Sequence, residues 1–137
     1  MNGILVDTCV LLDLFTADPV WGQWSETQLS KLLQSNSLFI NSIIYTEISI
    51  GFEQIETLDM ALAEMNIRVL EMPREALFLT GKVYLRYRRN KGTARLPLPD
   101  FFIGAHAAVT GFSLLTRDPR RFQTYYPKLN LIQPPFN

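Results

Sequence analysis

Four acidic side chains, each beside an apolar or small-residue segment, are the first candidates for chemistry: Asp7, Glu47, Asp100 and Asp118. Asp7 is the most informative, because it lies inside ILVDTCVLLDLF, a run that otherwise suits a protein interior. Burying a carboxylate without a cation or hydrogen-bond donors is costly in free energy. Asp7 therefore needs a partner, unless it lies at an exposed end of the run.

If the four acids meet, their like charges repel and a positive group must neutralise them. The chain has one cysteine and one histidine, too few for a typical zinc site. A set of carboxylate oxygens instead suits a hard cation, either Mg²⁺ or Mn²⁺. These residue types predict a divalent metal site with Asp7 as one of its ligands.

Segments of strand length and helix length alternate along the chain. Apolar runs of strand length occupy residues 4–6, 38–40, 68–70, 113–115 and 129–132. Helix-like segments occupy residues 9–15, 23–35, 43–65 with a break near Gly51, 74–90 and 99–110. This alternation predicts an α/β fold, a three-layer α/β/α sandwich around a mainly parallel sheet. No repeat or flexible linker divides the sequence, so we expect a single domain over residues 1–137.

Two of the acids directly follow predicted strands. Ligands of parallel α/β sheets bind beyond the carboxyl ends of the strands, and Asp7 and Asp118 are both expected there. A purely structural interpretation exists for each. Asp7 would cap the following helix, a role that Thr8 could also fill, and Asp118 would be the N-cap of a helix that starts at Pro119.

The other two acids are expected near the starts of helices. Glu47 is placed early in the helix after residues 38–40, for which residues 41–42 offer a cap. Asp100 follows Pro99, which favours a first helical turn where the helix dipole stabilises an acid. A solvated helix face for Glu47 and a simple first-turn acid for Asp100 are the alternatives. Only the joint placement of all four acids at one sheet edge favours a functional site.

The composition is that of a soluble globular protein, with 47% hydrophobic and 19% charged residues. The single cysteine, Cys9, allows no internal disulfide, which fits a reducing compartment. The N-terminal segment has no basic region of the signal-peptide type, and no apolar stretch is long enough to cross a bilayer. We expect a cytoplasmic protein that does not bind membranes.

The net charge of zero hides two unlike halves. Residues 1–75 contain eleven acidic and three basic residues, a balance of −8, whereas residues 76–137 contain two acidic and ten basic residues, a balance of +8. A basic surface attracts phosphates, so the second half predicts an RNA-binding face.

The candidates for RNA contact are Lys82, Arg86, Arg89, Arg117 and Arg120. The first three share one helical face by their spacing, with Tyr84 and Tyr87 among them. For any single residue of that helix, an ordinary solvated face opposite a core stripe of Leu79, Val83 and Tyr87 is the alternative.

The sequence resembles the PIN-domain ribonucleases and, within them, the VapC-like toxins of bacterial toxin–antitoxin pairs. The matching segments are ILVDTCVLLDLF, INSIIYTEISIGFE, LPDFFIGAHAAVTGFSLLTRDPRRF and the closing LNLI with its prolines. Their order and spacing agree across nearly the whole chain. Each segment alone is a weak signal, and the four in order are fairly specific.

The resemblance implies roles for individual residues. Asp7, Glu47, Asp100 and Asp118 match the family's metal-binding and catalytic acids. Thr8 and Thr116 match positions where the family has a hydroxyl near the site, whereas Cys9 stands where Asn or Ser is more frequent.

The resemblance also implies an activity and partners. The activity is that of a Mg²⁺- or Mn²⁺-dependent endoribonuclease that leaves 5′-phosphate and 3′-hydroxyl ends, with transfer RNA among the family's substrates. The implied partners are a second copy of the chain in a homodimer and a small DNA-binding antitoxin of the VapB type.

Three other functions remain open from the sequence. A phosphohydrolase of the haloacid dehalogenase type also has an aspartate after its first strand, but it normally has a second acid two residues later, where this chain has Cys9. A noncatalytic RNA- or protein-binding module on the same fold is the second alternative. A metal-independent nuclease using His106 and a glutamate is the third, although His106 within GAHAAVTG is most simply a packed or surface helix residue.

Overall fold

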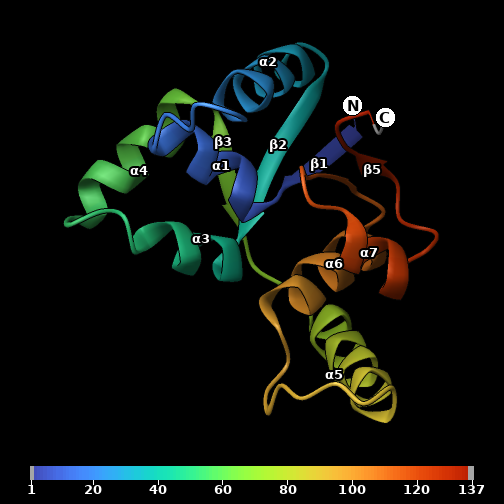
Figure 1. Ribbon diagram of the computed structural model, residues 1–137. Coiled ribbons are helices and arrows are strands. Elements are labelled where there is room, and N and C mark those ends of the chain that lie inside the picture. The colour runs from blue at the N-terminus through green and yellow to red at the C-terminus, as the bar shows by residue number, and fades with distance from the viewer. Residues whose placement is uncertain (1, 136–137) are drawn as a thin grey trace.

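A five-stranded parallel sheet forms the centre of the molecule in the computed structural model, which describes residues 2–135 (Figure 1). Its strand order is β3-β2-β1-β4-β5, and every neighbouring pair is parallel. The strands are β1 (Asn2–Val6), β2 (Asn36–Asn41), β3 (Ile67–Leu70), β4 (Ser113–Leu115) and β5 (Leu131–Ile132). The prediction of a three-layer sandwich with a mainly parallel sheet is confirmed, although β5 is shorter than the predicted run.

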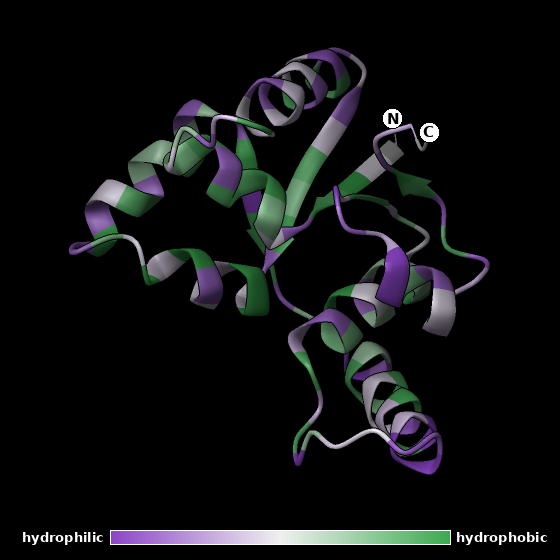
Figure 2. Cartoon of the chain, in the orientation of Figure 1, coloured by the Kyte–Doolittle hydropathy of each residue, from purple (hydrophilic) through white to green (hydrophobic). Residues whose placement is uncertain are grey.

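Apolar side chains on both faces explain why these segments are central strands. Ile4, Leu5 and Val6 are almost fully buried, as are Leu38 and Ile40 in the neighbouring strand. A parallel sheet covered by helices on both faces requires such continuous apolar runs, because neither face meets water. The middle of the sheet is accordingly green, the colour of hydrophobic residues, in Figure 2.

Helices cover the two faces of the sheet. They are α1 (Thr8–Phe15), α2 (Gly22–Leu33), α3 (Ser42–Ser49), α4 (Ile55–Glu64), α5 (Arg74–Arg89), α6 (Pro99–Thr110) and α7 (Arg120–Tyr125). The first four lie on one side of the strands, and α6 and α7 lie on the other with α5 packed against α6 (Figure 1). Within residues 2–135, no helix combines the length and apolar character that crossing a membrane requires.

The chain reverses its direction of travel across the sheet at β1. From β1 it adds β2 and then β3 on one side, and after α5 and α6 it returns to place β4 on the other side of β1. The carboxyl ends of β1 and β4 therefore lie at a topological switch point, which is where open parallel sheets usually bind ligands. Asp7 and Thr116 are the first residues after these two strands.

The predicted helix boundaries are close to those observed, with two corrections that affect site residues. The predicted break near Gly51 is confirmed, because α3 ends at Ser49 and α4 begins at Ile55. Glu47 is the sixth residue of the eight-residue α3 and therefore lies late in the helix, not early. Asp118 is not an N-cap, because α7 begins at Arg120 after Pro119.

Close packing of α6 against α7 depends on a glycine. A Cβ atom at Gly104 would lie 2.4 Å from Cε2 of Tyr126. The Tyr126 hydroxyl donates a hydrogen bond to the Phe101 carbonyl at 2.6 Å, which fixes the ring over that glycine. The contact holds α6, the helix that begins with Asp100, in its place beside the sheet.

Candidate active site

Asp7 bridges the first helix and the β1–β4 junction. Its Oδ1 accepts a hydrogen bond from the Thr8 backbone N–H at 2.8 Å, and its Oδ2 accepts one from the Thr116 hydroxyl at 2.8 Å. Its backbone N–H donates to the Leu115 carbonyl at 2.9 Å, which continues the pairing of the two strands. Asp7 is thus the N-cap of α1 and also lies at the predicted site.

Burial determines the electrostatics of Asp7, which is only 6% exposed. Burial, together with the nearby charge of Asp100, raises the pKa of Asp7 to about 6 against the opposing effect of the hydrogen bonds from Thr116, Cys9 and Thr8. Among residues 2–135, Asp7 forms no ion pair. Its charge is therefore balanced by dipoles alone, and a cation at this point would relieve the cost of burying it.

Cys9 is a neutral donor to Asp7. Its Sγ donates to Asp7 Oδ2 at 3.4 Å and lies 3.7 Å from the Thr116 hydroxyl oxygen. Burial, followed by the charge of Asp7, raises the pKa of the Cys9 thiol to about 12. The thiol therefore stays protonated near neutral pH and behaves here as a hydrogen-bond donor, not as a nucleophile.

Glu47 reaches the same edge of the sheet from α3. The Thr8 hydroxyl donates to Glu47 Oε1 at 2.6 Å. Thr8 therefore links the two acids, because its backbone N–H donates to Asp7 and its side chain donates to Glu47. Asn41, the last residue of β2, caps α3 by accepting hydrogen bonds from the backbone N–H groups of Ile43 and Ile44. The predicted cap at residues 41–42 is thus confirmed.

Asp100 and Asp118 are close to the other acids but are paired with arginines. Asp100 Oδ2 accepts from Arg121 Nη1 at 3.1 Å. Burial raises the pKa of Asp100 and the charge of Asp118 adds to the rise, although Arg121 acts in the opposite direction. The Asp118 backbone N–H donates to the Thr116 hydroxyl at 3.1 Å, while its exposed carboxylate lies 3.6 Å from Arg120 Nε.

The donor chemistry of these residues fits a hard divalent cation. Every side chain that could ligate is a carboxylate or a hydroxyl, apart from the protonated Cys9 thiol. Among residues 2–135, however, no three acidic, histidine or cysteine side chains are already arranged to hold a metal ion. The reason is visible in the contacts: Glu47 is turned to Thr8, Asp100 to Arg121 and Asp118 to Arg120.

Sequence reasoning missed a second buried carboxylate beside this group. Asp13 is 2% exposed and accepts hydrogen bonds at its Oδ2 from Arg117 Nε at 2.8 Å and from the Ser25 hydroxyl at 2.9 Å. The available signal was its position, because Asp13 is the second acid within an apolar run that forms a buried helix. Its partner Arg117 lies 104 residues away in the sequence, and no local pattern indicates that pairing.

His106 is a packed helix residue, which is one of the two alternatives, packed or at the surface, that the sequence indicated. It is 1% exposed, and its Nδ1 lies 3.0 Å from Nδ2 of Asn41. Because the Asn41 amide N–H donates, Nδ1 is assigned as the acceptor. The pair joins α6 to the cap of α3 and so connects the helices that carry Asp100 and Glu47.

The predicted RNA-binding residues of α5 are all exposed. Arg86 donates to the Tyr125 carbonyl at 3.0 Å and lies over the Tyr125 ring, which ties α5 to α7. Lys82 lies over the Phe78 ring, and Arg89 is in the last turn. The C-terminal end of α5 is strongly hydrophilic in Figure 2. RNA binding by these residues stays a prediction.

Comparisons with known proteins agree on the fold. VapBC2 from Rickettsia felis bound to a DNA fragment from their promoter is similar with a TM-score of 0.75 and 18% identity, over 97% of this chain and 99% of that chain. VapBC-1 from nontypeable Haemophilus influenzae is similar with a TM-score of 0.72 and 20% identity, over 96% of this chain and 97% of that chain. FitAcB from Neisseria gonorrhoeae is similar with a TM-score of 0.67 and 18% identity, over 94% of this chain and 96% of that chain.

These low identities establish a shared fold and no more. No protein of curated function matches the chain in sequence. The PIN domain family, in contrast, matches residues 4–126, a segment that contains all four candidate acids and both hydroxyls. The chain therefore belongs to the PIN domain family.

Proposed function

We propose that this PIN domain is a metal-dependent endoribonuclease, the toxin of a VapBC-like toxin–antitoxin pair. The observation that carries the proposal is Asp7, a carboxylate buried at the switch point of the sheet and compensated only by hydrogen-bond donors among the described residues. Burying such a group costs free energy of folding, and perturbed carboxylates of this kind concentrate at functional sites.

The cofactor is Mg²⁺ or Mn²⁺, held by Asp7, Glu47, Asp100 and Asp118. When bound, either ion lowers the pKa of a water molecule and stabilises the negative charge that develops during phosphodiester hydrolysis. The chain's own residues prepare this step. Thr116 and the Thr8 backbone hold the two oxygens of Asp7, and the Thr8 hydroxyl orients Glu47.

The substrate is single-stranded RNA, including the exposed loops of transfer RNA. The chemical support is the excess of basic residues in the half of the chain that contains Asp100 and Asp118. The residues proposed to contact RNA are Lys82, Arg86, Arg89, Arg117 and Arg120, with Arg120 and Arg117 directly beside Asp118.

The partners are a VapB-like antitoxin and a second copy of the chain, in the cytoplasm. The support for an antitoxin is that the similar structures are named as VapBC and FitAcB assemblies, one of them on promoter DNA. A short reading frame for a DNA-binding protein directly beside this gene is the expected genetic arrangement.

Removal of single acids tests the activity. Purified Asp7→Asn and Asp100→Asn variants should retain the fold, measured by circular dichroism, and should lose cleavage of RNA in Mg²⁺ or Mn²⁺ by at least two orders of magnitude, because each loses a metal-binding charge. Glu53→Gln is the matched control, since Glu53 is an exposed acid between α3 and α4. Full activity in either aspartate variant would refute the site assignment.

Chelation separates the proposal from its alternatives. Cleavage by the wild-type protein should stop in EDTA and return when Mn²⁺ is added. Cleavage that survives EDTA would instead favour a metal-independent nuclease. RNA binding by the wild-type protein without cleavage under any metal condition would favour a noncatalytic module on the same fold.

A further inference from the structure

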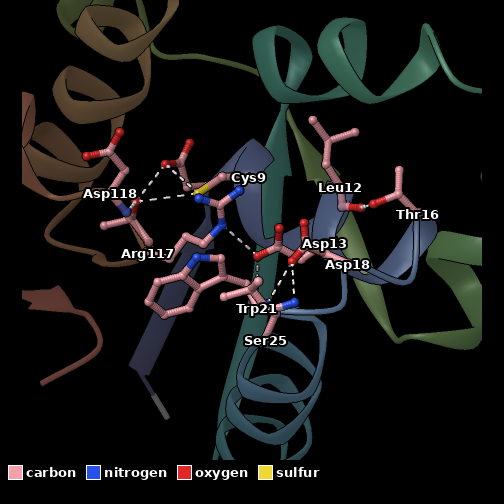
Figure 3. Close-up of polar contacts among 12 residues, drawn as sticks. Cys9, Leu12, Asp13, Thr16, Asp18, Trp21, Ser25, Arg117 and Asp118 are labelled. Carbon is pink, nitrogen blue, oxygen red and sulfur yellow. Dashed lines mark hydrogen bonds and ion pairs between the residues drawn. The ribbon is translucent and has the colours of Figure 1, made fainter.

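Arg117 is held in place by contacts outside the group of four acids. Its Nε donates to Asp13 Oδ2 at 2.8 Å, and its guanidinium carbon lies 5.7 Å from the centroid of the Trp21 ring (Figure 3). Ser25 supports Asp13 from α2 with a second hydrogen bond at 2.9 Å. We call the contacts of Arg117 with Asp13 and Trp21 the anchor. Because Asp13 is buried, the anchor has little freedom to move.

The anchor leaves most of the donors of Arg117 available. The Nε–H is used by Asp13 and one face of the guanidinium lies toward Trp21. Within residues 2–135, the two terminal Nη groups have no hydrogen-bond partner, and the side chain is 30% exposed. A guanidinium in this state presents a planar pair of N–H donors, which matches two oxygens of a phosphate.

Arg117 is also in fixed register with Asp7. It lies between Thr116, which donates to Asp7, and Asp118, whose backbone N–H donates to Thr116. Arg117 also interacts electrostatically with Cys9, the residue whose thiol donates to Asp7. The free donors of Arg117 are therefore carried by the same short segment as two other site residues, and they are close to Cys9, which itself contacts Asp7.

A comparison with the neighbouring arginines shows what the anchor does. Arg120 and Arg121 are paired with Asp118 and Asp100, two of the candidate metal ligands. Arg117 is instead paired with Asp13, which keeps its positive charge off Asp7. The anchored side chain neither competes with a cation for Asp7 nor rotates away from the site.

We infer that Arg117 binds a phosphate of the RNA next to the bond that is cleaved, and that Asp13 and Trp21 position it for that contact. The inference rests on the proposed function and deepens it, because it names the side chain that places the substrate's phosphodiester against the acids. Asp13 and Trp21 act only through Arg117 and do not themselves contact the substrate.

The test measures binding and cleavage separately. Fluorescence anisotropy of a labelled single-stranded RNA in EDTA, across 50 to 200 mM salt, gives affinity without cleavage. Arg117→Gln should weaken binding on the order of tenfold and make the plot of log affinity against log salt shallower by about 0.7, the value for one lost phosphate contact on a single strand. Arg117→Lys should keep the salt slope, because it keeps the charge, but should lower kcat, because it loses the planar pair of donors.

Positioning by Asp13 has its own readout. Asp13→Asn should leave the salt slope unchanged, since Arg117 retains its charge, and should reduce kcat more than it raises KM, because the guanidinium is no longer held off the acids. A single variant could unfold because a buried charge has lost its partner. The double variant Asp13→Asn with Arg117→Gln removes both charges, and it should show the loss of salt slope expected for Arg117→Gln. Lys31→Gln is the control, because Lys31 is exposed at the end of α2, which leads to the opposite edge of the sheet.

The outcomes distinguish the inference from the function on which it rests. An Arg117→Gln variant with wild-type slope, affinity and kcat, in a protein whose wild type binds and cleaves RNA, would refute the phosphate contact and leave the nuclease proposal standing. A wild-type protein that neither binds nor cleaves RNA would refute the proposed function and this inference with it. A loss of slope in Lys31→Gln equal to that in Arg117→Gln would also refute a specific role for Arg117.

Discussion

The side chain of Asp7 is buried where the carboxyl ends of β1 and β4 meet, and its neighbours donate hydrogen bonds without supplying a positive charge. Its ionised form is therefore less favourable in the folded protein than in the unfolded chain. The metal-free protein folds at a cost that depends on pH, and a mutation that removes the charge removes the cost.

This cost predicts a specific pH dependence in EDTA. The pKa of Asp7 rises from 3.8 to about 6 on folding, so its contribution is most favourable below the lower value and is lost as the pH rises through the higher one. Between pH 4 and pH 7 the Asp7→Asn variant should gain stability relative to wild type by about 2 kcal/mol, because the unfolded chain is already partly ionised at pH 4. Urea unfolding at each pH, with Glu53→Gln as control, measures the difference, and a difference that does not change with pH would contradict it.

At the residue scale, the sequence indicated candidate acids but not the contacts that they make. Asp7 was identifiable because a charge in an apolar run always requires an explanation. The Asp13–Arg117 pair and the Asn41–His106 pair were not, because their members are 104 and 65 residues apart and meet only once the sheet order is known. Which acids pair with arginines likewise depends on tertiary structure.

At the scale of elements, the placement of α6 depends on how closely Tyr126 approaches it. Gly104 offers the room for that ring, and Gly81 in α5 is a glycine with nothing within 4 Å of its missing Cβ. The two positions therefore separate the effect of packing from that of helix propensity.

The same substitution should have opposite effects at these two glycines. Gly104→Ala should lower the free energy of unfolding by roughly 1–3 kcal/mol, because the new methyl group overlaps a ring that is hydrogen-bonded to Phe101. Gly81→Ala should raise it by about 0.5–1 kcal/mol through helix propensity alone. Chemical denaturation of both variants checks the pair, and equal destabilisation at the two positions would show that the ring contact does not matter.

Element types followed from hydrophobic periodicity, but the start of α7 did not. Apolar runs buried on both faces indicate parallel strands, and the central ones were placed within a few residues. The start of α7 was wrong because the Asp118 backbone N–H bonds to Thr116, and its carboxylate lies near Arg120 instead of capping the helix. A sequence pattern for a helix cap cannot show that the backbone N–H of Asp118 already donates to the hydroxyl of Thr116, two residues earlier.

At the scale of the whole molecule, metal binding and folding should be linked. An ion that binds only the folded state stabilises it by about 2.7 kcal/mol at a concentration 100-fold above its dissociation constant. Mn²⁺ should therefore raise the melting temperature of the wild-type protein by several degrees. Asp7→Asn should show little or no such rise, because its site lacks one charge.

Differential scanning fluorimetry with and without Mn²⁺ makes this measurement independently of RNA. Glu53→Gln should respond as the wild type does. An equal rise in Asp7→Asn would place the ion elsewhere on the molecule.

The two halves of the chain with balances of −8 and +8 are also two regions of the fold. The acidic residues 1–75 include α1 to α4, and the basic residues 76–137 include most of α5 together with α6 and α7 on the opposite side of the sheet (Figure 1). The protein is thus an electric dipole whose boundary crosses the β1–β4 junction. In solution the field of that dipole orients the molecule before any contact is made. An approaching polyanion therefore meets the α5–α7 side, whereas a positively charged partner meets the α1–α4 side.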